Sequence, residues 1–161
     1  CDWSSDVCSS DLAYPASRAS GDHLQRIQGV VAFYRQKFGK PVWLMGHSNG
    51  AISVAEFLRK FPGQVAGAIF SSSRIGVKMP ADPALPVLFL HHRSEGCPKA
   101  DPRGDRELFD SLQAAGRKNV EFAWLTGGQA ERGNPCSSGF HMFYGAEAEA
   151  YRTIDSFIAR H

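Results

Sequence analysis

Short apolar runs alternate along this chain with segments that show helical periodicity. The apolar runs occupy residues 42–45, 65–70, 87–90 and 120–125. The segments 20–38, 51–61 and 105–115, and a last one over about 144–160, carry apolar residues at three- and four-residue steps, the period of a helix. Strands that alternate with helices are typical of a parallel sheet covered on both faces. The pattern predicts an α/β fold, a doubly wound and mostly parallel sheet that forms a single domain over residues 13–161.

Composition and charge exclude several classes of function. Hydrophobic residues make up 43% and charged residues 21% of the 161 residues, as in ordinary globular proteins. The formal net charge of +2 and the lack of a long basic run give no indication of a nucleic-acid or anionic-membrane partner. No apolar stretch approaches the ~20 residues that a membrane-spanning helix needs. We therefore expect a globular protein with no nucleic-acid partner and no membrane span.

The first twelve residues, CDWSSDVCSSDL, lack both helical and strand periodicity and do not begin with Met. They resemble a translated sequencing adapter, and a native Ser/Asp-rich segment is the alternative. If residues 1–12 are not native, the natural chain continues upstream of Ala13 in a different sequence. Any signal peptide is then outside the printed sequence.

The segment Gly46-His47-Ser48-Asn49-Gly50 fits the pattern G-x-S-x-G, directly after one expected strand and directly before an expected helix. In that setting the pattern predicts a sharp turn that lifts a nucleophilic serine clear of the sheet. Such a strained turn requires small neighbours, a role we assign to Gly46 and Gly50. We expect the Asn49 backbone N–H, at the start of the helix, to stabilise a developing oxyanion.

Residues 41–58 resemble the nucleophile-elbow segment of the α/β-hydrolase superfamily, and residues 13–161 resemble its C-terminal half in order and spacing. The resemblance implies an N-terminally truncated α/β-hydrolase fold, a serine esterase-like activity on a small-molecule acyl substrate, and no cofactor. It also implies a second oxyanion donor upstream of Ser20. For that reason we expect the 161-residue chain by itself to be inactive or poorly soluble.

The same resemblance places the catalytic base after the fourth strand and the acid after the third. His141 stands at the position of the base. Glu95 stands where the family usually has an aspartate, with Asp101 as the second choice and Asp82, which precedes the strand, as a distant third. His91 and His92 end the third strand, before the expected acid, so the family order argues against them as bases. His47 is expected to line the pocket or to pack, and His23 and His161 are expected to be solvated.

Two cysteines flank these positions, because Cys97 follows Glu95 by two residues and Cys136 precedes His141 by five. If the triad implied by the resemblance is correct, the two loops meet and a Cys97–Cys136 disulfide can join them. The protein would then be periplasmic or secreted. Free thiols in a cytoplasmic protein are the alternative. A zinc site that combines both thiols with His91 or His92 lacks supporting spacing.

We therefore predict a serine hydrolase that cleaves a carboxylic ester or a related acyl bond through an acyl-enzyme on Ser48. A non-catalytic α/β-hydrolase-fold binding protein, or an inactive fragment, is the competing interpretation, because the acid loop is atypical. The sequence indicates neither the substrate nor the oligomeric state.

Overall fold

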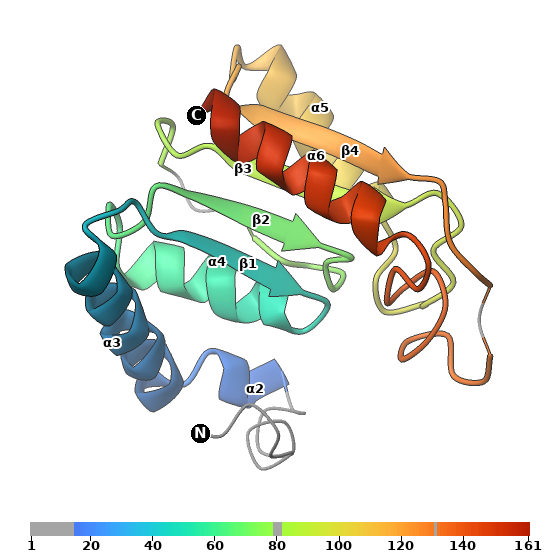
Figure 1. Ribbon diagram of the computed structural model, residues 1–161, viewed down its shortest axis with the longest axis horizontal. Coiled ribbons are helices and arrows are strands. Elements are labelled where there is room, and N and C mark those ends of the chain that lie inside the picture. The colour runs from blue at the N-terminus through green and yellow to red at the C-terminus, as the bar shows by residue number, and fades with distance from the viewer. Residues whose placement is uncertain (1–14, 79–81, 131) are drawn as a thin grey trace.

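The computed structural model describes residues 15–78, 82–130 and 132–161. The expected non-native segment 1–12 lies outside these residues. Four parallel strands form one sheet in the order β1-β2-β3-β4, as the alternating pattern predicted (Figure 1). The strands are β1 (Trp43–His47), β2 (Gly67–Ser71), β3 (Val87–His92) and β4 (Val120–Leu125).

Helices cover both faces of this sheet. On one face lie α3 (Gly21–Phe38), α4 (Gly50–Lys60) and α5 (Arg103–Ala114), and on the other lies α6 (Glu147–Arg160), with the short α2 (Pro15–Arg18) preceding α3. Within the described part of the chain, no helix has the length and apolarity that crossing a bilayer requires. The arrangement is the doubly wound α/β layer that the sequence predicts.

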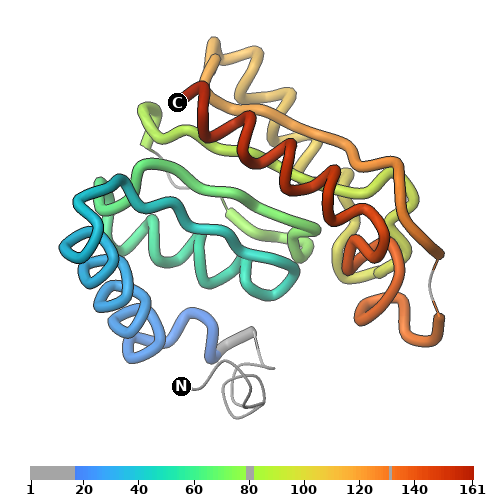
Figure 2. The backbone as a smooth tube through the Cα atoms, viewed as in Figure 1, coloured from blue at the N-terminus to red at the C-terminus, as the bar shows by residue number. Residues whose placement is uncertain are grey.

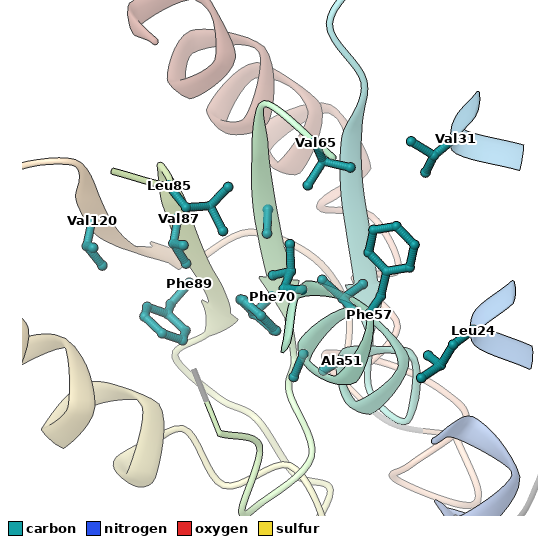
Figure 3. Packing of buried hydrophobic residues seen from close by; sticks show 14 residues of the cluster. Leu24, Val31, Ala51, Phe57, Val65, Phe70, Leu85, Val87, Phe89 and Val120 are labelled. Carbon is teal, nitrogen blue, oxygen red and sulfur yellow. The ribbon is translucent and has the colours of Figure 1, made fainter. Parts of the chain in front are cut away.

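A separate hydrophobic cluster fills each side of the sheet. On the α4 side, Phe57 packs with strand residues that include Phe70 and Phe89, whose rings stack with centroids 5.7 Å apart (Figure 3). On the α6 side, Phe157 is fully buried and its ring meets that of Trp43 edge to face. Burying each such aromatic side chain stabilises the fold by roughly 1.5–3 kcal/mol. Both faces of the central strands are therefore apolar, as expected for a sheet covered twice.

Capping side chains and residues with positive φ set where the helices begin and end. Ser20 caps α3, because its side chain accepts a hydrogen bond from the His23 N–H, and Gly39 ends that helix in the left-handed region at φ 59°. The last helix begins at Glu147 and not near residue 144 as expected. Phe143 and Gly145 have φ of 59° and 77°, values that a right-handed helix excludes.

The carboxyl ends of the four strands lie along one edge of the sheet. His47 of β1 is in register with Ser71 of β2, and His92 of β3 is in register with Leu125 of β4. The loops after β3 and after β4 consequently lie side by side at this edge (Figure 2). Ser48, Glu95 and His141 each lie in the segment that follows one of these strand ends, where open parallel sheets bind ligands.

Candidate active site

Ser48 occupies a sharp turn between β1 and α4. Its φ is 51°, in the left-handed region that residues other than glycine rarely adopt. The Ser48 N–H donates to the Ser71 carbonyl at 2.9 Å, and its own carbonyl accepts from the N–H groups of Ala51 and Arg74 at 3.1 and 3.3 Å. Three backbone bonds therefore hold a strained residue in place, an arrangement that is common where strain is part of function.

Gly46 and Gly50 were expected to keep this turn slim, and the structure separates their roles. A Cβ on Gly46 would lie 2.5 Å from the Gly50 carbonyl oxygen, so only glycine fits there. A Cβ on Gly50 would meet no heavy atom within 4 Å, which makes the expectation for Gly50 wrong. The turn folds back so that the Gly50 backbone, and no side chain, approaches Gly46.

His141 and Glu95 are in direct contact. The His141 Nδ1 lies 3.1 Å from both carboxylate oxygens of Glu95, and the two side chains are 0% and 2% exposed. Because a carboxylate only accepts, the imidazole N–H is on Nδ1 and donates to it. The neutral ring consequently carries its lone pair on Nε2, the atom that a general base uses.

The carboxylate of Glu95 is kept ionised by its hydrogen bonds. Burial alone would raise the pKa of Glu95, but hydrogen bonds from the His141 ring and from the Cys97 N–H, at 2.9 Å, hold that pKa below its ordinary value. The resulting anion can orient the imidazole and stabilise its protonated form.

The Nε2 of His141 is buried and has no hydrogen-bond partner among the described residues. No hydrogen bond joins it to Ser48 within that part of the chain, so the structure brings base and acid together but leaves the base and the serine unlinked. In enzymes without bound substrate this link is commonly long and tightens when substrate binds.

His47 packs beside the base. Its ring centroid lies 5.1 Å from that of His141 and 5.5 Å from that of Phe143, and its Nδ1 lies 3.0 Å from the Ser71 Oγ. Burial, together with the nearby His141, lowers the pKa of His47 to about 4. His47 is therefore neutral at pH 7, and it lines a cavity of about 190 Å³, as expected. The other lining residues are Met45, Met142, Phe143, Glu147, Ala150, Tyr151 and Ile154.

Asn49 precedes the first turn of α4, where its backbone N–H was expected to stabilise an oxyanion. Its side-chain Oδ1 accepts a hydrogen bond from Arg74 Nη1 at 3.1 Å. This bond ties the start of α4 to the loop after β2. Arg74 and the positive end of the helix together place positive charge close to Ser48.

A disulfide joins Cys97 to Cys136, with the Cα atoms 4.5 Å apart. It links the loop that carries Glu95 to the loop that carries His141. Since both sulfurs are committed to this bond, neither the free-thiol alternative nor the zinc alternative fits the structure. Among the described residues, no group of three or more His, Cys, Asp or Glu side chains is arranged to hold a metal ion.

The competing acids lie elsewhere. Asp101 pairs with Arg103 at the start of α5, and Asp82 accepts from the Ala84 N–H before β3. Neither contacts His141, so the structure favours Glu95 over both.

His23, expected to be solvated, is only partly exposed, and its Nε2 lies 2.9 Å from the Ser53 Oγ. His161 is exposed, as expected, and its Nε2 lies 3.6 Å from a Glu121 carboxylate oxygen. The sequence assigns no role to His91 and His92, because it favours them neither as bases nor as zinc ligands. His91 donates from Nε2 to Asp105 at 2.9 Å, whereas His92 contacts the loop that carries Glu95 (the acid loop, residues 93–102) and the loop after β4 that carries His141. The only signal in the sequence is that two histidines end one buried strand.

One family model matches a large part of this chain. A hydrolase family model described as "Serine aminopeptidase, S33" matches residues 18–132, more than two thirds of the chain. The chain belongs to this family of α/β hydrolases. The match includes Ser48 and Glu95 and ends before His141. A search among curated proteins finds no match.

Solved structures show the same fold as this hydrolase. The monoacylglycerol lipase of Paleococcus ferrophilus is 15% identical with a TM-score of 0.56, over 86% of this chain and 74% of the lipase chain. A thermostable esterase is 16% identical with a TM-score of 0.52, over 84% of this chain and 36% of the esterase chain. At these identities the likeness establishes the fold and not the chemistry of the site.

Proposed function

We propose that this hydrolase cleaves a carboxylic ester or a related acyl bond through an acyl-enzyme formed on Ser48. The observation that carries the proposal is the buried contact between Glu95 and His141 Nδ1, at 3.1 Å to each oxygen, at the sheet edge where Ser48 occupies a strained turn. A serine hydroxyl needs a base to take its proton, and the base needs an acid to orient it.

The roles follow from the protonation states. His141, with its lone pair on Nε2, removes the proton as the Ser48 Oγ attacks the acyl carbonyl. Glu95 stabilises the imidazolium that forms, and the Asn49 N–H donates to the oxyanion. His141 then returns its proton to the leaving alcohol, and water attacks the acyl-enzyme by the same path. No metal or cofactor takes part in these steps.

The family description and the solved neighbours suggest different acyl bonds. The matched family is described as an aminopeptidase, whereas the two similar structures are those of a lipase and an esterase. The cavity beside His47 favours an apolar acyl group, since Glu147 is the one charged residue among those that line it. We therefore place an uncharged ester ahead of a peptide with a free amino group.

Burst kinetics test the proposal. The protein, expressed from its complete reading frame, is mixed with p-nitrophenyl acetate in one assay and with an aminoacyl p-nitroanilide in another. We expect a burst of about one p-nitrophenolate per enzyme, followed by slower turnover. Ser48→Ala should abolish the burst and lower kcat by at least about 1,000-fold, while Ser156→Ala, on the exposed side of α6, should change neither. Turnover that survives Ser48→Ala would contradict the proposal, and a folded protein with no turnover at all would favour the binding-protein alternative.

A further inference from the structure

His92 is the last residue of β3 and is only 1% exposed. Both of its ring nitrogens have backbone partners. The Ser94 N–H donates to Nδ1 at 3.0 Å, and Nε2 lies 2.6 Å from the Gly127 carbonyl oxygen. Because the amide only donates and the carbonyl only accepts, these contacts require a neutral ring with its proton on Nε2.

The flat side of the same ring stacks on Phe140, with centroids 4.3 Å apart and planes 12° from parallel. Phe140 immediately precedes His141, and Gly127 is the second residue after β4. His92 therefore contacts the base loop (residues 126–130 and 132–146) near its start, at Gly127, and at Phe140, the residue before His141. Through Ser94 it also contacts the residue before Glu95.

We propose that His92 is a positioning residue of this active site, which sets the distance between Glu95 and His141 by holding the acid loop and the base loop together. It acts through Ser94 and Phe140 and makes no contact with Ser48 or with the catalytic imidazole in the described structure. The catalytic part of this inference rests on the proposed function.

The position of His92 relative to the disulfide supports this role. The disulfide ties residue 97 to residue 136, and His92 ties residue 94 to residue 140, so Glu95 lies between the two crosslinks on the acid loop. On the base loop, His141 follows both attachment points. Both catalytic side chains come from irregular backbone that has no sheet or helix bonds of its own, and small displacements at such positions are costly to catalysis.

Three substitutions separate the contacts of His92. His92→Phe retains a flat ring over Phe140 but loses both hydrogen bonds. His92→Asn retains an acceptor for the Ser94 N–H, and His92→Gln retains a donor for the Gly127 carbonyl. We expect His92→Phe to lower kcat for p-nitrophenyl acetate by about 10- to 100-fold with KM nearly unchanged. The Asn or Gln variant should recover part of that loss.

His91→Phe is the matched control, because His91 is the preceding residue of the same strand and its side chain is on the opposite face, paired with Asp105 and stacked on Phe122. Both Phe variants should lose stability. Only His92→Phe should also shift or broaden the downfield proton NMR resonance of the His141 Nδ1–H, which reports the bond to Glu95 directly.

An unchanged His141 resonance and an unchanged kcat per folded molecule in His92→Phe would overturn the proposal. The resonance keeps this test independent of the proposed function. If the unmodified protein shows no Ser48-dependent turnover, the proposed function fails, and the resonance in the His92 variants still decides whether His92 positions the pair.

Discussion

Both carboxylate oxygens of Glu95 lie 3.1 Å from the Nδ1 of His141, 46 residues further along the chain. This contact fixes which nitrogen of the imidazole carries the proton and leaves Nε2 free to act as a base. It also shows that a glutamate, one methylene longer than the usual aspartate, reaches the ring from this loop.

Glu95→Gln should lower kcat/KM for ester hydrolysis by about 1,000- to 10,000-fold, because an amide can donate to Nδ1 and so stabilise the wrong tautomer. Asp101→Asn is the control, since Asp101 pairs with Arg103 and does not contact His141. Steady-state kinetics of both variants measure the difference. Equal losses of kcat/KM in the two variants would contradict the proposed role of Glu95 as the catalytic acid.

Reduction of the Cys97–Cys136 disulfide should destabilise the protein by up to about 4 kcal/mol, the chain-entropy value for a loop of 39 residues. Urea unfolding of the protein and of its Cys97→Ser/Cys136→Ser variant measures this. Peptide mapping after alkylation without reductant reports the bond itself. Alkylated Cys97 and Cys136 in the purified, unreduced protein would show that the bond is not formed.

Gly46→Ala should cost several kcal/mol of unfolding free energy, because the new methyl group would press on the Gly50 carbonyl. Gly50→Ala should be neutral or stabilising by less than about 1 kcal/mol, since the site is open and alanine favours the helix. Thermal or urea unfolding of the two variants provides the comparison. A Gly46→Ala protein as stable as Gly50→Ala would disprove the packing argument.

Acid should destabilise the fold through His47 and Glu95. The pKa of His47 is lowered to about 4 by burial, so the unfolded chain, with an ordinary histidine pKa of ~6.5, takes up this proton first. The contribution of His47 to stability is therefore complete above about pH 6.5 and is lost as pH falls toward 4. Glu95, whose folded pKa is lowered, adds a further loss as pH falls below about 4.5.

Urea unfolding between pH 7.5 and pH 4 measures this dependence. His47→Gln, which removes one titrating group, should make the unfolding free energy fall less steeply between pH 6.5 and pH 4. An unchanged slope in that variant would contradict the burial argument for His47.

The fold could be predicted because its signals are local. The apolar runs and helical periods identified all four strands and the helices from α3 onward, and Ser20 and Gly39 correctly marked the ends of α3. The start of α6 could not be predicted in this way. The positive φ of Phe143 arises in the packed loop around His141 and leaves no mark in the helical pattern of the sequence.

The same distinction between local and tertiary signals applies to the residues of the active site. Ser48 is visible from the sequence, because its motif, strand and helix are contiguous. The contact of Glu95 with His141 depends on two loops meeting, so the sequence could only order the candidates by family resemblance. The contacts of His92 with Ser94, Gly127 and Phe140 are entirely tertiary, and no spacing rule indicates them.

Covalent trapping at Ser48 tests the central claim most directly. The protein is treated with a fluorophosphonate, digested, and mapped by mass spectrometry. We predict one phosphonyl adduct per chain, located on Ser48, that is absent in Ser48→Ala and strongly slowed in Glu95→Gln. A folded protein that carries no adduct on Ser48, or that carries it on another serine, would contradict the account.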